Sequence, residues 1–149
     1  MTDETYDRAR LRAELERDEG DKRRPYRCPA GHLTAGIGHN LDAHELSDAV
    51  IEMWFTEDLA EAEATLDGWL RDWRELDDAR QRALLNMAFN LGATRLAGFK
   101  RLKSCLVGYL ATRTESWLGH AADEMLASKW AQQVGPRADR LAALMRGEP

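Results

Sequence analysis

The segment "ARQRALLNMAFNLG", residues 79–92, constrains the fold of this chain most strongly. Its Leu84, Met87 and Leu91 keep a helical spacing, and further apolar residues lie on its other faces. A helix that is apolar on more than one face has to be covered by other elements on several sides. The segment is therefore predicted to be the central helix of a mostly helical body.

Other stretches of the chain carry the start and stop signals of helices around this one. Asp77 or Asp78 is the expected N-cap of the central helix, and Gly92 is its expected end. Ser47 precedes a helix with a long apolar stripe, and Pro136 suits the first turn of the last helix. That stripe consists of Ile51, Phe55, Leu59, Ala62 and Leu66. The predicted helices cover residues 5–18, 48–66, 79–92, 99–110, 115–130 (capped by Thr114) and 136–145.

A segment poor in large apolar residues follows the first helix. Residues 24–41 predict short strands around a turn at residues 29–31, with Leu33, Ala35 and Ile37 alternating along one strand. Such a sheet has at most one buried face and is not stable by itself, so it must pack against helices. The fold class is therefore α+β and mostly α, with residues 1–149 as a single domain whose small β lobe covers about 20–45.

Composition excludes several classes of protein. Hydrophobic residues make up 44% of the 149 residues, enough for a core, and no apolar run reaches the roughly 18 residues of a membrane span. The charged N-terminus lacks the apolar middle of a signal peptide, so synthesis in the cytosol is expected. The basic residues form no recognition-helix pattern, which argues against a nucleic acid partner. Cys28 and Cys105 make neither a zinc spacing nor a disulfide framework.

Glu19, Cys28 and Thr34 form the candidate catalytic set. Glu19 ends a helix, where the negative end of the dipole disfavours a charged carboxylate, and a protonated acid is what a glycosidic leaving oxygen needs. Thr34 can hold a water molecule, and Cys28 supplies a thiol or thiolate. A hairpin would bring these two together, facing Glu19. An acid opposite a water-holding pair fits inverting glycoside hydrolysis, in which acid and base lie roughly 6.5–9.5 Å apart.

The spacing of these residues resembles the signature of phage-type lysozymes, the endolysins of glycoside hydrolase family 24. Eight residues separate Glu19 from Cys28, and five separate Cys28 from Thr34. The surrounding "PYRCPAGHLTAGIGH" and the later "NMAFNLG" and "SKWAQQVGPRADRL" resemble the family in order and spacing. The resemblance covers about residues 11–145 and implies a lysozyme-like fold. It also implies a peptidoglycan hydrolase that cleaves between N-acetylmuramic acid and N-acetylglucosamine and lyses bacteria.

The resemblance also implies residue roles. Glu19 would be the general acid, Cys28 would replace the Asp of better-known members, and Thr34 would help to hold the water. Asn86 and Asn90 would face the glycan, and Arg137 falls where the family keeps an arginine against the catalytic Glu. No metal and no cofactor is expected.

The resemblance further implies the partner and the place of action. The partner would be the glycan strands of peptidoglycan, without stable membrane insertion, and the protein is expected to be a monomer. It would be made in the bacterial host cytoplasm and would reach the cell wall through a holin-type pore.

Two other functions remain open from the sequence. One is a lytically inactive lysozyme-like protein that binds the wall or serves as a structural part of a phage particle. The other is a lytic transglycosylase, which uses one acid and forms an anhydro-sugar. The sequence also leaves open whether Cys28 acts as base, as nucleophile or only in packing, and whether the reaction inverts or retains configuration.

Overall fold

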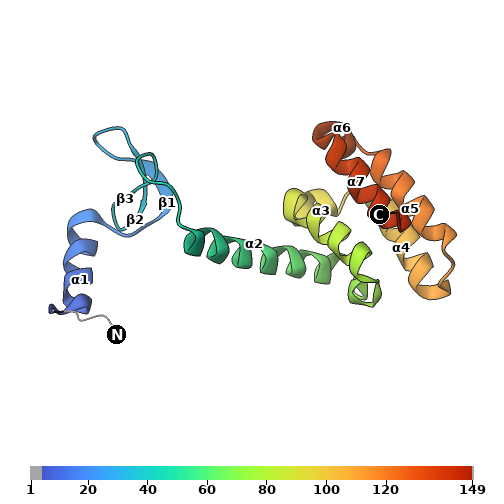
Figure 1. Ribbon diagram of the computed structural model, residues 1–149, viewed down its shortest axis with the longest axis horizontal. Helices are drawn as coiled ribbons and strands as arrows, with labels where there is room; N and C mark the ends of the chain where they lie inside the picture. The colour runs from blue at the N-terminus through green and yellow to red at the C-terminus, as the bar shows by residue number, and fades with distance from the viewer. Residues whose placement is uncertain (1–4, 149) are drawn as a thin grey trace. The chain divides into compact units, whose positions relative to one another are not determined.

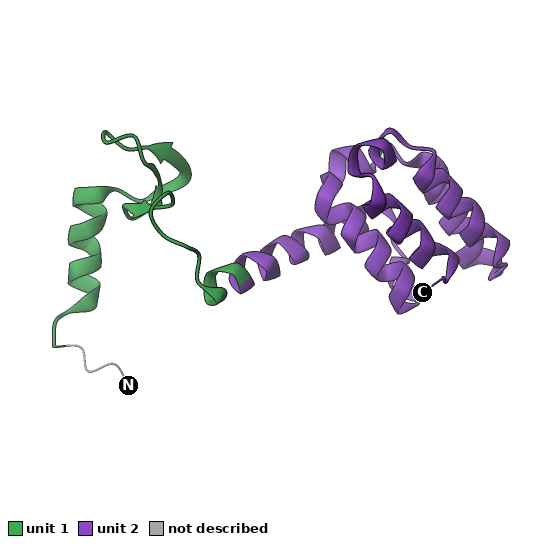
Figure 2. Cartoon of the chain, turned by 45° about the horizontal axis from the view of Figure 1, so that its top comes forward, with its two compact units in different colours: residues 1–51 green, residues 52–149 purple. Residues whose placement is uncertain are grey.

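The computed structural model describes residues 5–148 of the chain, which divide into two compact units (Figures 1 and 2). Unit 1 ends at Ile51, and unit 2 begins at Glu52. Helices dominate, and one small antiparallel sheet follows the first helix. The predicted fold class, mostly helical α+β with a small sheet after the first helix, is confirmed. That residues 1–149 form a single domain stays a prediction.

Unit 1 opens with helix α1 (Arg8–Glu19), close to the predicted range. Asp7 caps it by accepting a hydrogen bond from the backbone of Arg10 at 3.0 Å. Gly20 ends it with a φ of +80°, a backbone conformation that glycine adopts without steric cost. Its two leucines, Leu11 and Leu15, lie four residues apart and are both exposed.

The sheet of unit 1 consists of strands β1 (Lys22–Arg27), β2 (Leu33–Gly36) and β3 (His39–Asn40), with β2 in the middle. The predicted turn between β1 and β2 is confirmed. The alternation along β2, however, indicated the wrong face. Thr34 is the buried residue of this strand, at 5% exposure, whereas Leu33 and Ala35 are only half-buried.

Helix α2 (Asp48–Trp69) is capped by Ser47 as predicted, since its hydroxyl accepts from the backbone N–H of Val50 at 3.3 Å. The apolar stripe of this helix is buried only in part. Leu66 is fully buried, but Ile51 and Phe55 at the other end are about half exposed. The apolar stripe predicted from the sequence therefore does not mark buried residues in the first turns of the helix.

Helix α3 (Asp78–Leu96) is the central helix of unit 2, as predicted. Asp77 is its cap and accepts from the backbone of Arg80 at 3.0 Å. Gly92 takes a φ of +70° and breaks the regular helix at the expected place, but the chain then adds one more helical turn. The buried side chains of α3 are Ala83, Leu84, Met87, Ala88, Leu91 and Leu96.

Four more helices and one 3-10 turn complete unit 2. They are η1 (Trp73–Glu75), α4 (Lys100–Thr112), α5 (Ser116–Leu126), α6 (Lys129–Val134) and α7 (Pro136–Arg146). Pro136 opens the last helix as predicted. Figure 1 shows α4, α5 and α7 running alongside one another, and their apolar sides form the core of this unit together with α3.

The prediction of one helix over residues 115–130 was wrong. The chain leaves the helix after Leu126, and the hydroxyl of Ser128 accepts from the backbone of Ala131 at 3.1 Å to start α6. A serine in this role is a strong N-cap, which the apolar periodicity of the segment concealed. Thr114 is not the expected side-chain cap either, because the N-cap position of α5 is Glu115 and no side chain makes a capping hydrogen bond there.

Candidate active site

Glu19 lies at the end of α1, and its side chain reaches the turn between β2 and β3. Its Oε2 atom is 2.9 Å from the position that a Cβ atom would take on Gly38. Gly38 has a φ of +66°, so both its backbone conformation and its missing side chain suit this contact. Gly38 was not predicted as a site residue, because it is distant from Glu19 along the chain and no local pattern pairs the two.

Cys28 occupies the turn that follows β1. Its backbone N–H donates to the carbonyl oxygen of His32 at 3.0 Å, and its own carbonyl accepts from Gly31 at 2.8 Å. These two bonds close the turn around the thiol, which is half-buried. The tight hairpin expected from the sequence is therefore present, and it fixes the backbone on both sides of Cys28.

The surroundings of Cys28 favour its ionised form. The backbone N–H of His32 does most to lower the pKa of the thiol below its ordinary value of 9.0. Partial burial opposes this shift, but the N–H groups of Ala30 and Gly31 and the hydroxyl of Thr34 reinforce it. A lower pKa means that more of the thiol is thiolate at neutral pH, and the thiolate is the reactive form.

Thr34 lies on the central strand of the sheet and is next to Cys28. Its hydroxyl donates to the carbonyl oxygen of His32 at 3.0 Å. A hydrogen bond between the same hydroxyl and the Cys28 side chain helps to lower the pKa of the thiol. A hydroxyl has one hydrogen and two lone pairs, so it can donate to only one of these partners at a time. Its lone pairs remain able to accept a hydrogen bond from water.

Two residues predicted to bind substrate are joined in unit 2. Arg137 of α7 donates from Nε to Oδ1 of Asn86 at 2.8 Å, and from Nη2 to the Asn86 backbone oxygen at 3.3 Å. Both residues line a groove of about 620 Å³ whose other walls are mainly apolar, including Phe55 and Phe89. The expected pairing of Arg137 with Glu19 joins residues of different units and stays a prediction.

Asn90, the third residue predicted to bind substrate, has a different partner. Its Oδ1 atom accepts from the indole N–H of Trp130 at 2.9 Å, which connects α3 to α6. Trp130 itself is buried at 3% exposure, in line with a packing role. The side-chain oxygen of Asn90 is thus occupied, and its amide NH₂ remains the group that could donate to a ligand.

Between residues 5 and 148, no group of three or more His, Cys, Asp or Glu side chains is placed to hold a metal ion. No helix in the same range combines the length and the apolar character needed to cross a membrane.

Comparison with known proteins identifies the family. Residues 16–146 match the sequence model of the phage lysozyme family, a range that contains Glu19, Cys28 and Thr34. The chain therefore belongs to the phage lysozyme family. At the level of that family it is a glycoside hydrolase of the muramidase type, with peptidoglycan as substrate.

Two similar relatives come from Dictyostelium discoideum. Probable T4-type lysozyme 1 is 24% identical over 160 residues, covering 88% of this chain and 90% of the relative. Probable T4-type lysozyme 2 is 26% identical over 163 residues, covering 90% and 92%. The similarity thus extends over nearly the whole length of each protein.

Proposed function

We propose that this chain is a lysozyme that hydrolyses the β-1,4 bond between N-acetylmuramic acid and N-acetylglucosamine, with Glu19 as the general acid. The observation that carries this proposal is the hairpin that sets the hydroxyl of Thr34 against the thiol of Cys28, in the same unit as Glu19. Glu19 would give its proton to the glycosidic oxygen, which then leaves as a hydroxyl group.

Cys28 and Thr34 would act at the sugar carbon of the same glycosidic bond, where they would supply the attacking water or the nucleophile. In one route, Thr34 holds a water molecule, the Cys28 thiolate takes a proton from it, and the water oxygen bonds to the sugar carbon in a single inverting displacement. In the other route, the Cys28 sulfur bonds to that carbon first, and water displaces it in a second step. The lowered pKa of Cys28 supports both routes, since each uses the thiolate.

Asn86, Asn90 and Arg137 would bind the glycan. Asn86 and Arg137 are held together on one groove, and Asn90 retains a free amide NH₂ after bonding Trp130. A guanidinium group and amide groups suit the hydroxyl and acetamido groups of amino sugars, because they can donate several hydrogen bonds in fixed directions. In this role the two asparagines act in binding and not in proton transfer.

The place of action is a further part of the proposal. We infer that the protein is made in the cytoplasm of a bacterial host, works as a monomer, and reaches the cell wall through a holin-type pore. Cells that produce the protein alone should stay intact until their membrane is permeabilised, and lysis without permeabilisation would contradict this route.

Analysis of the released sugar ends tests the chemistry. Purified peptidoglycan digested with the protein should yield fragments with a reducing N-acetylmuramic acid end. A lytic transglycosylase would instead leave 1,6-anhydro ends, which lack the mass of one water molecule, and a lytically inactive binding protein would release no fragments. Reducing N-acetylglucosamine ends would show cleavage of the other glycosidic bond and would also contradict the proposal.

A further inference from the structure

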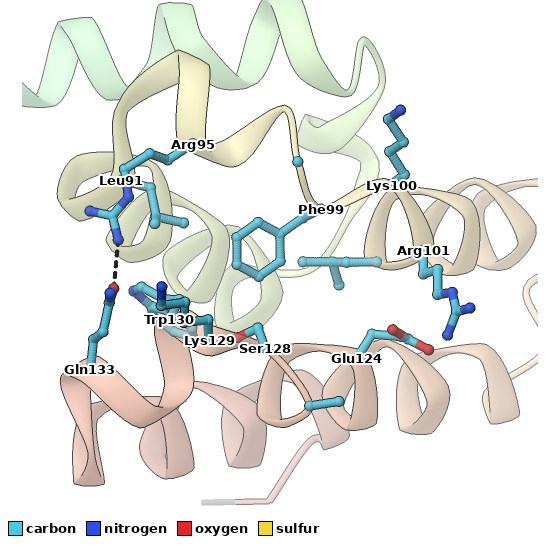
Figure 3. Close-up of a pocket in the computed structure, with 13 residues that line it drawn as sticks. Leu91, Arg95, Phe99, Lys100, Arg101, Glu124, Ser128, Lys129, Trp130 and Gln133 are labelled. Atoms are coloured by element: carbon cyan, nitrogen blue, oxygen red, sulfur yellow. Dashed lines mark hydrogen bonds between the residues drawn. The ribbon is translucent and has the colours of Figure 1, made fainter.

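A second large cavity lies in unit 2, away from Asn86 and Arg137. It measures about 680 Å³ and is formed by the end of α3, the start of α4, the end of α5 and the start of α6 (Figure 3). Two aromatic rings contribute to its wall, since Phe99 and Trp130 meet edge to face with centroids 6.2 Å apart. An apolar surface of this kind can cover the carbon skeleton of a ligand.

The rim of this cavity is strongly basic. Arg95, Lys100, Arg101 and Lys129 line it, and Glu124 is its one acidic residue. Within residues 5–148, none of these four cations forms an ion pair. Two of them lie in the first turn of α4, where the positive end of the helix dipole disfavours cations. The charges therefore do not serve helix stability there, and they suit an anionic ligand.

Arg95 is the cation that the structure holds in place. Its Nη2 atom donates to Oε1 of Gln133 at 2.8 Å, which bridges α3 and α6 at one end of the cavity (Figure 3). This bond uses one of the five N–H donors of the guanidinium group, so others remain for a ligand. A carboxylate can accept two of them side by side, whereas a carboxamide offers one acceptor and carries no charge.

The cavity is connected to a residue of the proposed glycan site. Trp130, part of the cavity wall, donates its indole N–H to Asn90. A glycan strand that contacts Asn90 would therefore pass close to the cavity. In peptidoglycan the muramic acid residues carry peptide stems with carboxylate groups, which bacteria leave free or convert to amides. These stems are the anionic groups that the glycan itself would bring to this place.

We propose that this cavity reads the charge of the peptide stems, with Arg95 as the specificity-determining residue that favours free carboxylates over carboxamides. The inference rests on the proposed function, because that function supplies the glycan to which the stems are attached. Lys100 and Lys129 add attraction that depends on charge but not on the direction of hydrogen bonds, and Arg101 adds a further cation that, among the described residues, no bond to a neighbouring element holds in place. Selectivity should accordingly weaken at high salt concentration.

Binding of free stem peptides tests this inference without any glycosidic bond to cleave. One probe carries its carboxylates free, the second has them converted to carboxamides, and affinity is followed through the amide NMR signals of residues 95–101 and 128–133. The parent should bind the free-acid peptide about three- to tenfold more tightly, as expected for one partly exposed, charge-assisted contact. Arg95→Gln should reduce this preference to less than twofold, and Arg95→Lys should retain part of it.

The control is Lys103→Gln, which removes one exposed cation from α4 outside the cavity lining and should leave the preference unchanged. Equal binding of the two peptides by the parent would overturn the inference, as would an equal loss of preference in the Lys103 and Arg95 variants. Digestion of glycan stripped of its peptides reports separately on the proposed function. A chain that cleaves stripped glycan but does not distinguish the peptides would refute the inference alone.

Discussion

The carboxylate of Glu19 lies against Gly38, with Oε2 only 2.9 Å from the position that a Cβ atom would occupy. Any side chain at residue 38 therefore has to displace the proposed general acid. Gly38→Ala should reduce the rate of peptidoglycan hydrolysis by about tenfold or more, because misplaced catalytic groups lose rate steeply. Turnover of labelled peptidoglycan under saturating conditions is the measurement.

Gly36 provides the matched control for this change. Its φ of +60° is close to that of Gly38, but nothing lies within 4 Å of a Cβ built on it. Gly36→Ala should carry the same backbone strain of about 1–2 kcal/mol without touching Glu19. Equal losses of rate in the two variants, at equal stability, would show that backbone strain and not contact with Glu19 limits activity.

The pH dependence of the rate tests the role of Cys28. The thiol ionises to its working form as pH rises, and its lowered pKa places this rise below the ordinary thiol range near 9.0. Activity should therefore rise with pH through the range in which the thiol ionises. Cys28→Asp should retain activity and move the rising limb toward the carboxyl range near about pH 4, whereas Cys28→Ala should be much slower.

Alkylation of Cys28 should abolish this activity, and Cys105 is the internal control. Burial does most to raise the pKa of the Cys105 thiol, with the charge of Glu124 adding to the effect. Cys105 should therefore resist the reagent. A Cys28→Ala variant as fast as the parent would show that Cys28 serves only in packing and that Thr34 alone positions the attacking water.

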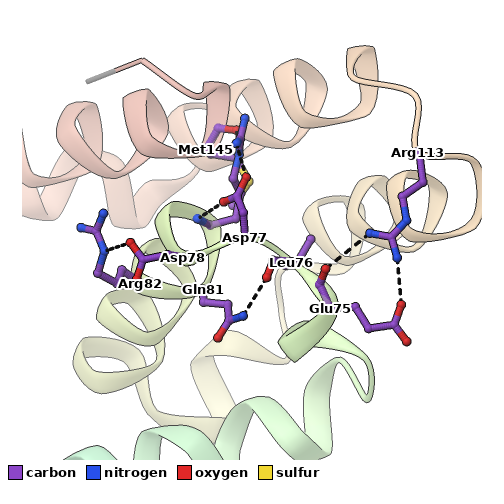
Figure 4. Close-up of polar contacts among 9 residues, drawn as sticks. Glu75, Leu76, Asp77, Asp78, Gln81, Arg82, Arg113 and Met145 are labelled. Atoms are coloured by element: carbon purple, nitrogen blue, oxygen red, sulfur yellow. Dashed lines mark hydrogen bonds and ion pairs between the residues drawn. The ribbon is translucent and has the colours of Figure 1, made fainter.

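Arg80 joins the start of α3 to the end of α7 through Asp77 and Met145, two residues that are labelled in Figure 4. Its Nε atom donates to the backbone oxygen of Met145 at 2.9 Å, and its side chain, 12% exposed, pairs with Asp77. Arg80→Ala should lower the free energy of unfolding by about 1–3 kcal/mol, because a partly buried carbonyl loses its donor. Arg82→Ala removes only an exposed pair with Asp78 and should change stability by less than about 1 kcal/mol.

The contribution of the Asp77–Arg80 contact to folding stability should depend on pH. Partial burial raises the pKa of this carboxyl, but hydrogen bonds from the backbone and side chain of Arg80 outweigh it, so the net shift is downward. Its contribution to stability is therefore complete above the ordinary pKa near 3.8 and is lost as pH falls through the lowered value. Urea unfolding from pH 5 to pH 2 should show a smaller loss of stability in Asp77→Asn than in the parent.

The packing of α4 on α5 depends on Gly108. A Cβ atom there would come within 2.7 Å of the Trp117 ring. Gly108→Ala should cost about 1–3 kcal/mol through overpacking, even though alanine is the better helix former. Gly119→Ala on α5 meets nothing within 4 Å and should instead stabilise the protein by up to about 1 kcal/mol. Thermal unfolding that moved in the same direction for both variants would contradict this account.

The sequence predicted most of the fold because its helices carry strong local signals. Ser47, Asp77 and Pro136 all mark helix starts, and each does so through its own side chain or ring. The break at Ser128 was missed because the apolar spacing continues across it. The buried position of Thr34 was missed because alternation along a four-residue strand cannot tell which face is covered.

The candidate site was predictable only in part. The spacing of Glu19, Cys28 and Thr34 is a sequence pattern, and the turn that joins Cys28 to Thr34 follows from local glycine and proline signals. The contact of Glu19 with Gly38 and the bond between Asn90 and Trp130 join residues that are distant along the chain. Such pairings depend on how the elements pack, and no local pattern encodes them.

Replacement of Glu19 by Gln tests the central claim most directly. The variant keeps the size of the side chain and removes only the proton that would pass to the glycosidic oxygen. Hydrolysis of purified peptidoglycan, measured as reducing N-acetylmuramic acid ends released per minute, should fall by a factor of about 100 or more relative to the parent, while the far-UV circular dichroism stays the same. A correctly folded Glu19→Gln variant that releases these ends at a rate near that of the parent would contradict the assignment of Glu19 as the general acid.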